Sequence, residues 1–153
     1  MATTGTRLGL SVNAGNVSIE CLIDTGACVT LLHHSVFKNI CRLNGRSRLL
    51  QPAPPIFNVL GEPIRVLGKT EIQFEHLGSL PVMVVDGILH QCILGDDALK
   101  AGKAVVDYGT PALWWRGRQL TVSPYGVPRD LNVLGFEAGL AGTADLADGV
   151  CLS

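Results

Sequence analysis

Long apolar runs are missing from this sequence, and nothing near its first residue resembles a signal peptide. A membrane-spanning helix needs about 18 or more consecutive apolar residues, and a secretory signal needs an apolar stretch behind a basic start. We therefore expect an intracellular protein with no membrane partner.

Charge is also scarce, and neither sign dominates. Charged residues make up 16% of the chain, and 12 basic residues against 13 acidic ones give a formal net charge of −1. Nucleic-acid-binding domains usually carry a marked basic surface. The loose group of Arg42, Arg46 and Arg48 is more typical of a solvated loop, so no nucleic-acid partner is expected.

The cysteines form neither a metal-binding nor a disulfide pattern. The chain has 5 of them, and no two are spaced as Cys-x-x-Cys. His33 and His34 are adjacent, which is not the spacing of two ligands of one metal ion. We expect free thiols in a reducing compartment, and we predict no metal and no other cofactor.

The chain does contain enough apolar residues for a core, arranged as many short strands. Hydrophobic residues make up 47% of its 153 residues, which suits a single domain. Short β-prone runs follow one another with a turn roughly every ten residues, which is typical of a closed or sandwiched all-β domain. The predicted strands cover residues 7–12, 17–23, 29–32, 57–60, 64–67, 69–74, 80–85, 90–94, 104–108, 112–115 and 119–122.

Helix is predicted in two short places. A single turn over 35–40 would have Ser35 as its cap, and a helix up to residue 101 would have Asp96 as its N-cap and stop at Gly102. Past Pro124 the chain is rich in Gly, Ala and Asp and has no sustained period. We therefore predict a folded domain over 1–124 and a flexible C-terminal tail or linker over 125–153.

One short motif, Asp24-Thr25-Gly26-Ala27, stands at a turn between two apolar runs. A carboxylate at a buried turn is costly to keep as an isolated ion. The cost falls when a second carboxylate lies beside it and the two share a proton. The chain has no second Asp-Thr-Gly or Asp-Ser-Gly, so a partner carboxylate would have to come from another copy of the chain.

This motif resembles the active-site motif of the retropepsins, the aspartic proteases of retroviruses and LTR retrotransposons. Two further segments carry the resemblance in the family's order. Ile93-Leu94-Gly95 stands directly before the predicted helix, as a hydrophobic-hydrophobic-Gly segment does in the family. The predicted hairpin over 57–66 lies where the family has its flap, with Gly61 at its tip and Gly68 as the alternative tip.

The resemblance implies a small closed β-barrel-like fold with one short C-terminal helix, active as a homodimer. Asp24 would be the catalytic residue of each copy, and Thr25, Gly26 and Ala27 would complete the active-site loop. Peptide substrate would contact the flap and walls at Val59, Leu60, Gly61, Ile93, Leu94 and Gly95. Further apolar walls would come from Ala27, Val29 and Leu31.

The resemblance further implies an aspartic endopeptidase that cleaves extended polypeptide segments. Its substrate would be a Gag-Pol-like polyprotein, in the cytoplasm or within a virus-like particle, and residues 125–153 would be a polyprotein linker. Many retroviral members have an acidic residue after the catalytic Ala and an arginine after the later Gly. Here these positions are Cys28 and Asp96, so that ion pair cannot form, which favours a retrotransposon-type enzyme.

Two other functions remain open. One is a non-catalytic dimerisation or peptide-binding module that keeps the same fold. The other is a cysteine-based activity, in which Cys28 or Cys92 would act with one of three histidines, His33, His34 or His90. The strands after the predicted helix carry Trp114 and Trp115, and we expect at least one of them to have a packing role.

Overall fold

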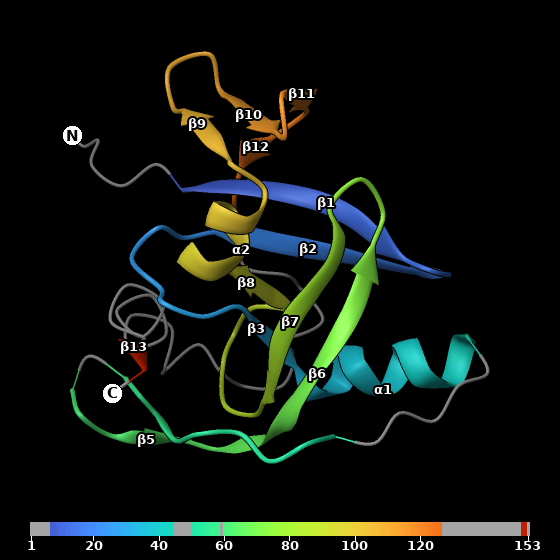
Figure 1. Cartoon of the computed structure of the whole chain (residues 1–153), viewed down its shortest axis with the longest axis vertical. Helices are drawn as coiled ribbons and strands as arrows, with labels where there is room; N and C mark the ends of the chain where they lie inside the picture. Colours follow the sequence, from blue (N-terminus) through green and yellow to red (C-terminus); the bar gives the residue numbers. More distant parts are fainter. Residues whose placement is uncertain (1–6, 45–49, 59, 127–150, 153) are drawn as a thin grey trace.

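A computed structural model describes residues 7–44, 50–58, 60–126 and 151–152 of the chain (Figure 1). Most of the described elements are strands, as the all-β prediction requires. The largest sheet has seven strands in the order β12-β1-β2-β8-β3-β7-β6. These are β1 (Leu8–Ala14), β2 (Val17–Ile23), β3 (Leu31–His33), β6 (Val66–Phe74), β7 (Gly78–Val85), β8 (Cys92–Leu94) and β12 (Ser123–Pro124).

The position of β8 fixes the centre of this sheet. It pairs in parallel with β2, placing Leu22 opposite Ile93, and antiparallel with β3, placing Ile93 opposite Leu31. The chain passes from β2 to β3 through the Asp24 turn, so both arms of that turn are hydrogen-bonded to the same strand. A turn held on both sides in this way has little freedom to move.

Two smaller sheets lie at opposite ends of the view in Figure 1. One has the order β11-β10-β9 and the other the order β13-β4-β5. The first contains β9 (Val105–Asp107), β10 (Ala112–Trp115) and β11 (Arg118–Leu120), and the second contains β4 (Ile56–Phe57), β5 (Pro63–Ile64) and β13 (Cys151–Leu152).

Side chains of successive strand residues divide the core into two clusters. Leu22, Leu31 and Ile93 belong to a cluster we call the loop cluster, because it also contains Ala27 and Val29 of the Asp24 turn. Its remaining buried members are Ile56, Met83, Val85 and Ile88. Residues next to these in the same strands, such as Cys21, Leu32 and Leu94, belong to the other, larger cluster. This division follows from the alternation of side chains across a sheet.

The first helix differs from the prediction of a single capped turn. Helix α1 (His34–Leu43) has 10 residues, and its N-cap is His33 rather than Ser35. The Nδ1 atom of His33 accepts a hydrogen bond from the Ser35 backbone N–H at 3.0 Å. Val36, Phe37 and Ile40 are buried along one face, so tertiary packing extends the helix beyond the one turn that its sequence suggested.

The second helix, α2 (Asp96–Ala101), has the predicted extent and ends at Gly102, but its N-cap is Gly95. Asp96 is therefore the first helical residue and not the cap. The cap makes no side-chain hydrogen bond. Trp115 lies against Gly102, where an added Cβ would come within 2.2 Å of the indole ring. Trp115 also donates from its Nε1 atom to the Leu77 carbonyl, which confirms a packing role for this tryptophan.

The hairpin over 57–66 is shorter in its strands than predicted. Among the residues that the structure describes here, only Ile56–Phe57 and Pro63–Ile64 pair, because the side chain of Asn58 closes the connection between them. Its Oδ1 atom accepts hydrogen bonds from the backbone N–H groups of Leu60 and Glu62, each at 2.9 Å. Gly61 lies in this connection with φ at +79°, a conformation that glycine adopts without strain.

Several other boundaries move by one to three residues. β3 begins at Leu31 rather than at residue 29, because Val29 and Thr30 belong to the Asp24 turn. β8 begins at Cys92 rather than at residue 90, because His90 turns inward against Tyr125. The tail from residue 127 to 150, and residue 153, lie outside the described residues. Cys151–Leu152 form a strand that the sequence did not predict. The domain boundary at residue 124 stays a prediction.

Candidate active site

Asp24 stands at the end of β2, and the backbone around it fixes its position. Its N–H donates to the Leu94 carbonyl at 3.0 Å, and its own carbonyl accepts from the Ala27 N–H at 3.3 Å. Its side-chain Oδ1 atom accepts from the Gly26 N–H at 2.8 Å. Only 7% of Asp24 is exposed. This main-chain hydrogen bond fixes the orientation of the largely buried carboxylate.

A second set of hydrogen bonds ties the turn to the start of α2. The Asp96 N–H donates to the Ala27 carbonyl at 2.6 Å. The Gly95 N–H donates to Thr30 Oγ1 at 3.1 Å, and the Thr30 hydroxyl donates to Asp97 Oδ1 at 2.7 Å. Sequence reasoning missed Thr30 and Asp97. The signal that could have found Thr30 is a polar residue inside the apolar run from Val29 to Leu32.

Gly95 is required where the β8–α2 junction crosses the Asp24 turn. A Cβ at this position would lie 2.3 Å from the Val29 carbonyl oxygen and 2.9 Å from that of Ala27. Both neighbours are backbone atoms, which cannot rotate away. The sequence singled out Gly95 as a substrate contact, and the structure places it instead beneath the turn.

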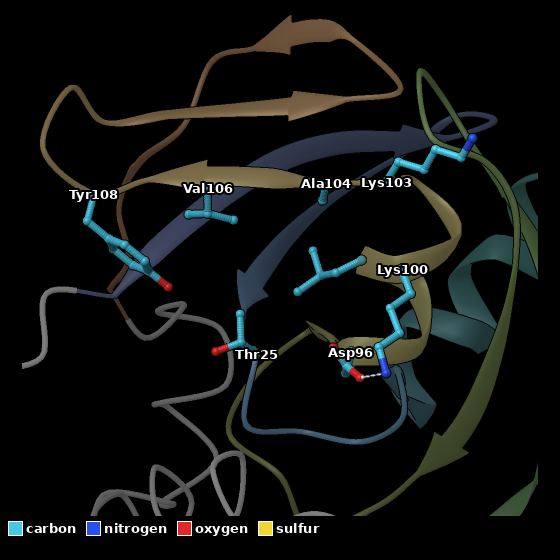
Figure 2. A pocket seen from close by; sticks show the side chains of 8 residues that line it. Thr25, Asp96, Lys100, Lys103, Ala104, Val106 and Tyr108 are labelled. Carbon is cyan, nitrogen blue, oxygen red and sulfur yellow. Dashed lines mark ion pairs between the residues drawn. The ribbon is translucent and has the colours of Figure 1, made fainter.

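Thr25 opens onto a cavity beside the turn. The cavity has a volume of about 540 Å³ and is lined by Thr25, Asp96, Leu99, Lys100, Lys103, Ala104, Val106 and Tyr108. Figure 2 shows Val106 and Tyr108, which follow α2, facing the same hollow as Thr25. Asp24 itself does not line this cavity, so Thr25 is the member of the motif exposed towards it.

The charges at the cavity belong mainly to α2. Lys100 Nζ lies 2.9 Å from Asp96 Oδ2 in an ion pair along the helix. The hydrogen bond that Lys100 donates to Asp96, and the negative charge of Asp96, raise the pKa of Lys100. Asp96, at the position where many retroviral proteases have arginine, thus pairs within its own helix.

The other predicted substrate contacts fall into two groups. Ile93 and Leu94 are 0% exposed and lie in the two core clusters beneath the turn. Leu60, by contrast, is 74% exposed on the hairpin connection next to Gly61. Val59 lies outside the described residues. The structure therefore brings Ile93, Leu94 and Gly95 beneath the Asp24 turn, and leaves Leu60 and Gly61 on the surface.

Two residues of the cysteine-based alternative, Cys92 and His90, are buried in the structure. Cys92 is 0% exposed and faces Cys21 across β8 and β2. The hydrogen bond between these two thiols, together with burial, raises the pKa of Cys21 well above its usual value. The Nδ1 atom of His90 lies 3.1 Å from the Tyr125 hydroxyl. Because Cys92 has no exposed surface, it is not placed to meet a substrate as a nucleophile.

The described residues were compared with the requirements of a metal site and of a membrane-spanning helix. No group of three or more His, Cys, Asp or Glu side chains in the described part could hold a metal ion. Across the same residues, no helix is both long enough and apolar enough to cross a membrane.

No family model matches the sequence. The structure is similar to the crystal structure of the retroviral protease-like domain of Ddi1 from Leishmania major, with a TM-score of 0.60 and 15% sequence identity. The match covers 78% of this chain and 96% of that chain. The chain has the retropepsin-like fold. A retropepsin-like aspartic protease from Rickettsia conorii matches 66% of this chain and 84% of that chain, with a TM-score of 0.47 and 19% identity.

Within this retropepsin-like fold, one chain presents one Asp-Thr-Gly turn. The turn holds a largely buried carboxylate next to an exposed threonine that borders an open cavity. A pair of carboxylates that shares a proton needs two such turns. A carboxylate pair would therefore require a second copy of the chain, with its own Asp-Thr-Gly turn next to Thr25.

Proposed function

We propose that this chain is an aspartic endopeptidase whose active site contains Asp24 from each of two copies. The observation that carries the proposal is the geometry of Asp24, a 7% exposed carboxylate held at a turn by the backbone of Gly26 and Leu94. A rigid acidic group at this place in a retropepsin-like fold suits acid–base chemistry. It has no evident purpose in a purely structural turn, where burial of a carboxylate is a cost.

Two Asp24 side chains related by a two-fold axis would share one proton, because close like charges prevent both from ionising. The ionised carboxylate takes a proton from a water molecule held between the pair. The protonated one donates to the carbonyl oxygen that the water attacks. The peptide bond is then broken after proton transfer to the leaving nitrogen, without a metal or other cofactor.

The second copy would dock on the side of the molecule that carries Thr25 and β9. β9 is an edge strand of its sheet among the described residues, because its one partner there is β10. Tyr108, which lines the Thr25 cavity, is 51% exposed, and Val105 in β9 is 58% exposed. An exposed strand edge with apolar side chains is a template for pairing with another chain. Thr25 lines the adjoining cavity, so docking here would bring two Asp-Thr-Gly turns together.

The substrate would be an extended polypeptide segment of roughly six to eight residues, bound as an added strand. Apolar residues around the scissile bond would suit the exposed Leu60 and the apolar surroundings of Ala27. A Gag-Pol-like polyprotein is the substrate that the retropepsin resemblance suggests.

The test is cleavage of a diverse peptide library at about pH 5 to 6, where a carboxylate pair can hold one proton. Wild type and Asp24→Asn are compared at several protein concentrations. We expect cleavage by wild type, none by Asp24→Asn, and a specific activity that falls on dilution, because the monomer lacks the pair. Raising the pH above the upper apparent pKa of the pair should also abolish cleavage.

Circular dichroism and urea unfolding of both proteins control for folding, because asparagine keeps the shape of aspartate. Cleavage by Asp24→Asn, or undiminished cleavage by a monomer, would refute the proposal. A folded wild-type protein that binds library peptides but never cuts them would instead favour the non-catalytic peptide-binding module.

A further inference from the structure

The edge of β4 is occupied by the end of the same chain. β4 has β5 on one side and β13 on the other, and β13 pairs antiparallel with it. Cys151 lies opposite Phe57, and Leu152 lies opposite Ile56. Residues about a hundred positions apart are thus brought together by main-chain pairing, the interaction by which extended peptides are added to sheet edges.

β4 connects this edge to the Asp24 turn. Ile56 is 0% exposed and packs in the loop cluster together with Ala27 and Val29. Cys28, which follows the Asp24 motif, packs against the same cluster. A strand that pairs with β4 is therefore added to the β4–β5 hairpin. The buried residue of that hairpin, Ile56, packs in the same cluster as the Asp24 turn. One strand edge can pair with one further strand only.

We propose that residues 151–152 are an internal strand ligand of the β4 edge and compete there with extended peptides. The docking of the segment follows from the pairing of β13 with β4. That it competes with a substrate rests on the proposed protease function.

The segment around residues 151–152 has the composition of a suitable ligand. Val150-Cys151-Leu152-Ser153 contains no charged side chain, and the nearest charge is Asp148. The apolar residue types at 151 and 152 suit an edge whose inner neighbours are the apolar residues of the loop cluster. The tether adds a further advantage, since a segment linked to its site has an effective concentration of about a millimolar.

Docking can be tested by cross-linking in the full chain, with no need for activity. In the Phe57→Cys variant, the new cysteine occupies the backbone position that is paired with Cys151. Antiparallel partners have Cα atoms roughly 4.5 to 5.5 Å apart, which is within the range of a disulfide. Dilute protein is oxidised with diamide and analysed by non-reducing gel and peptide mapping. We expect a disulfide between positions 57 and 151 within one chain.

The matched control is Leu60→Cys, a 74% exposed position on the same hairpin that has no partner in β13. Its cross-link to Cys151 should form with a yield about fivefold lower or less, since it lies outside the paired register. Equal yields in the two variants, or no cross-link in Phe57→Cys, would overturn the proposal. A product of twice the chain mass would also overturn it, because the strand would then dock on another copy.

Competition is tested by peptide binding in an Asp24→Asn background, so that no probe is cut. The probe is a fluorescein-labelled peptide with the sequence of residues 147–153 and serine in place of Cys151. Changing Cys151→Pro together with Leu152→Pro removes both amide donors and prevents strand pairing. We expect this variant to bind the probe with an apparent Kd about fivefold lower than the Asp24→Asn protein does.

Ser153→Pro is the matched control, because it adds a proline but keeps the amide donors of residues 151 and 152. It should bind the probe as the Asp24→Asn protein does. Equal affinity of all three proteins would overturn the competition, and so would a gain in Ser153→Pro as large as in the double variant. Because no step needs catalysis, these results are independent of whether the chain proves to be a protease.

Discussion

Thr30 donates its hydroxyl hydrogen to Asp97 at 2.7 Å, across a sequence separation of 67 residues. The same oxygen of Thr30 accepts from the Gly95 N–H. One buried hydroxyl therefore joins the turn that carries Asp24 to the first turn of α2. A carboxyl group must be held within a fraction of an ångström of its working position for acid–base catalysis. Thr30 and Asp97 hold the Asp24 turn to the start of α2, which is the restraint that the proposed acid–base chemistry would need.

Replacing Thr30 with valine should weaken this junction. Valine has the same shape but cannot hydrogen-bond, so the buried Gly95 N–H and Asp97 Oδ1 each lose a partner. We expect the free energy of unfolding to fall by about 1 to 3 kcal/mol, measured by urea denaturation. Thr30→Ser keeps the hydroxyl and should lose less. If valine and serine at position 30 gave equal stability, the hydrogen bonds would not be what holds the turn.

Gly95→Ala should displace the turn. The new methyl group would overlap the Val29 carbonyl at 2.3 Å, and backbone atoms on both sides leave it no room. We expect destabilisation by about 1 to 3 kcal/mol or more and loss of any peptide cleavage. The control is Gly126→Ala, where an added Cβ meets nothing within 4 Å. A stable, active Gly95→Ala protein would contradict the close crossing of the two segments.

His90 should make the fold less stable in acid. Burial, and then the charge of Arg7, lower its pKa from 6.5 to about 4. Above pH 6.5 the group is neutral in both states and has no effect. As the pH falls from 6.5 towards 4, the unfolded chain binds a proton that the folded chain refuses. The free energy of unfolding should therefore fall by about 3 kcal/mol across this window and level off below it.

Urea unfolding across the same pH window measures this loss. In His90→Gln, the loss of stability between about pH 6.5 and 4 should shrink by the contribution of one proton. The control is His76→Asn, at an exposed histidine whose φ of 70° asparagine tolerates. An identical pH dependence in wild type and His90→Gln would show that His90 is already free to bind a proton in the folded chain.

The proposed docking side of β9 can be tested with a charge. Tyr108→Lys places an ammonium group on a 51% exposed position that lines the Thr25 cavity and that the proposed dimer would bury. We expect a dimer dissociation constant at least about tenfold higher by analytical ultracentrifugation, because an unpaired buried charge is costly. Leu43→Lys, at a 44% exposed position at the end of α1, is the control. If both variants associated like wild type, the second copy would have to dock elsewhere.

The strand pattern was largely readable from the sequence. β2 (Val17–Ile23) and β10 (Ala112–Trp115) have the predicted bounds, because alternating side chains and flanking turn residues define them locally. α1 was underestimated, since its extension to Leu43 depends on packing against the sheet and not on a local cap. The short pairing of β4 with β5 was also missed, because the side chain of Asn58 competes there with the strand hydrogen bonds.

Local sequence patterns were enough to predict an all-β domain with one Asp-Thr-Gly turn, a glycine before a helix and a hairpin between them. These features depend on neighbouring residues, and their chemistry is visible in the residue types. Only the tertiary structure decided that β8 lies between β2 and β3, that Thr30 meets Asp97, and that residues 151–152 lie on β4. Such contacts join residues far apart in the chain, and the order of strands that creates them is not encoded in any local pattern.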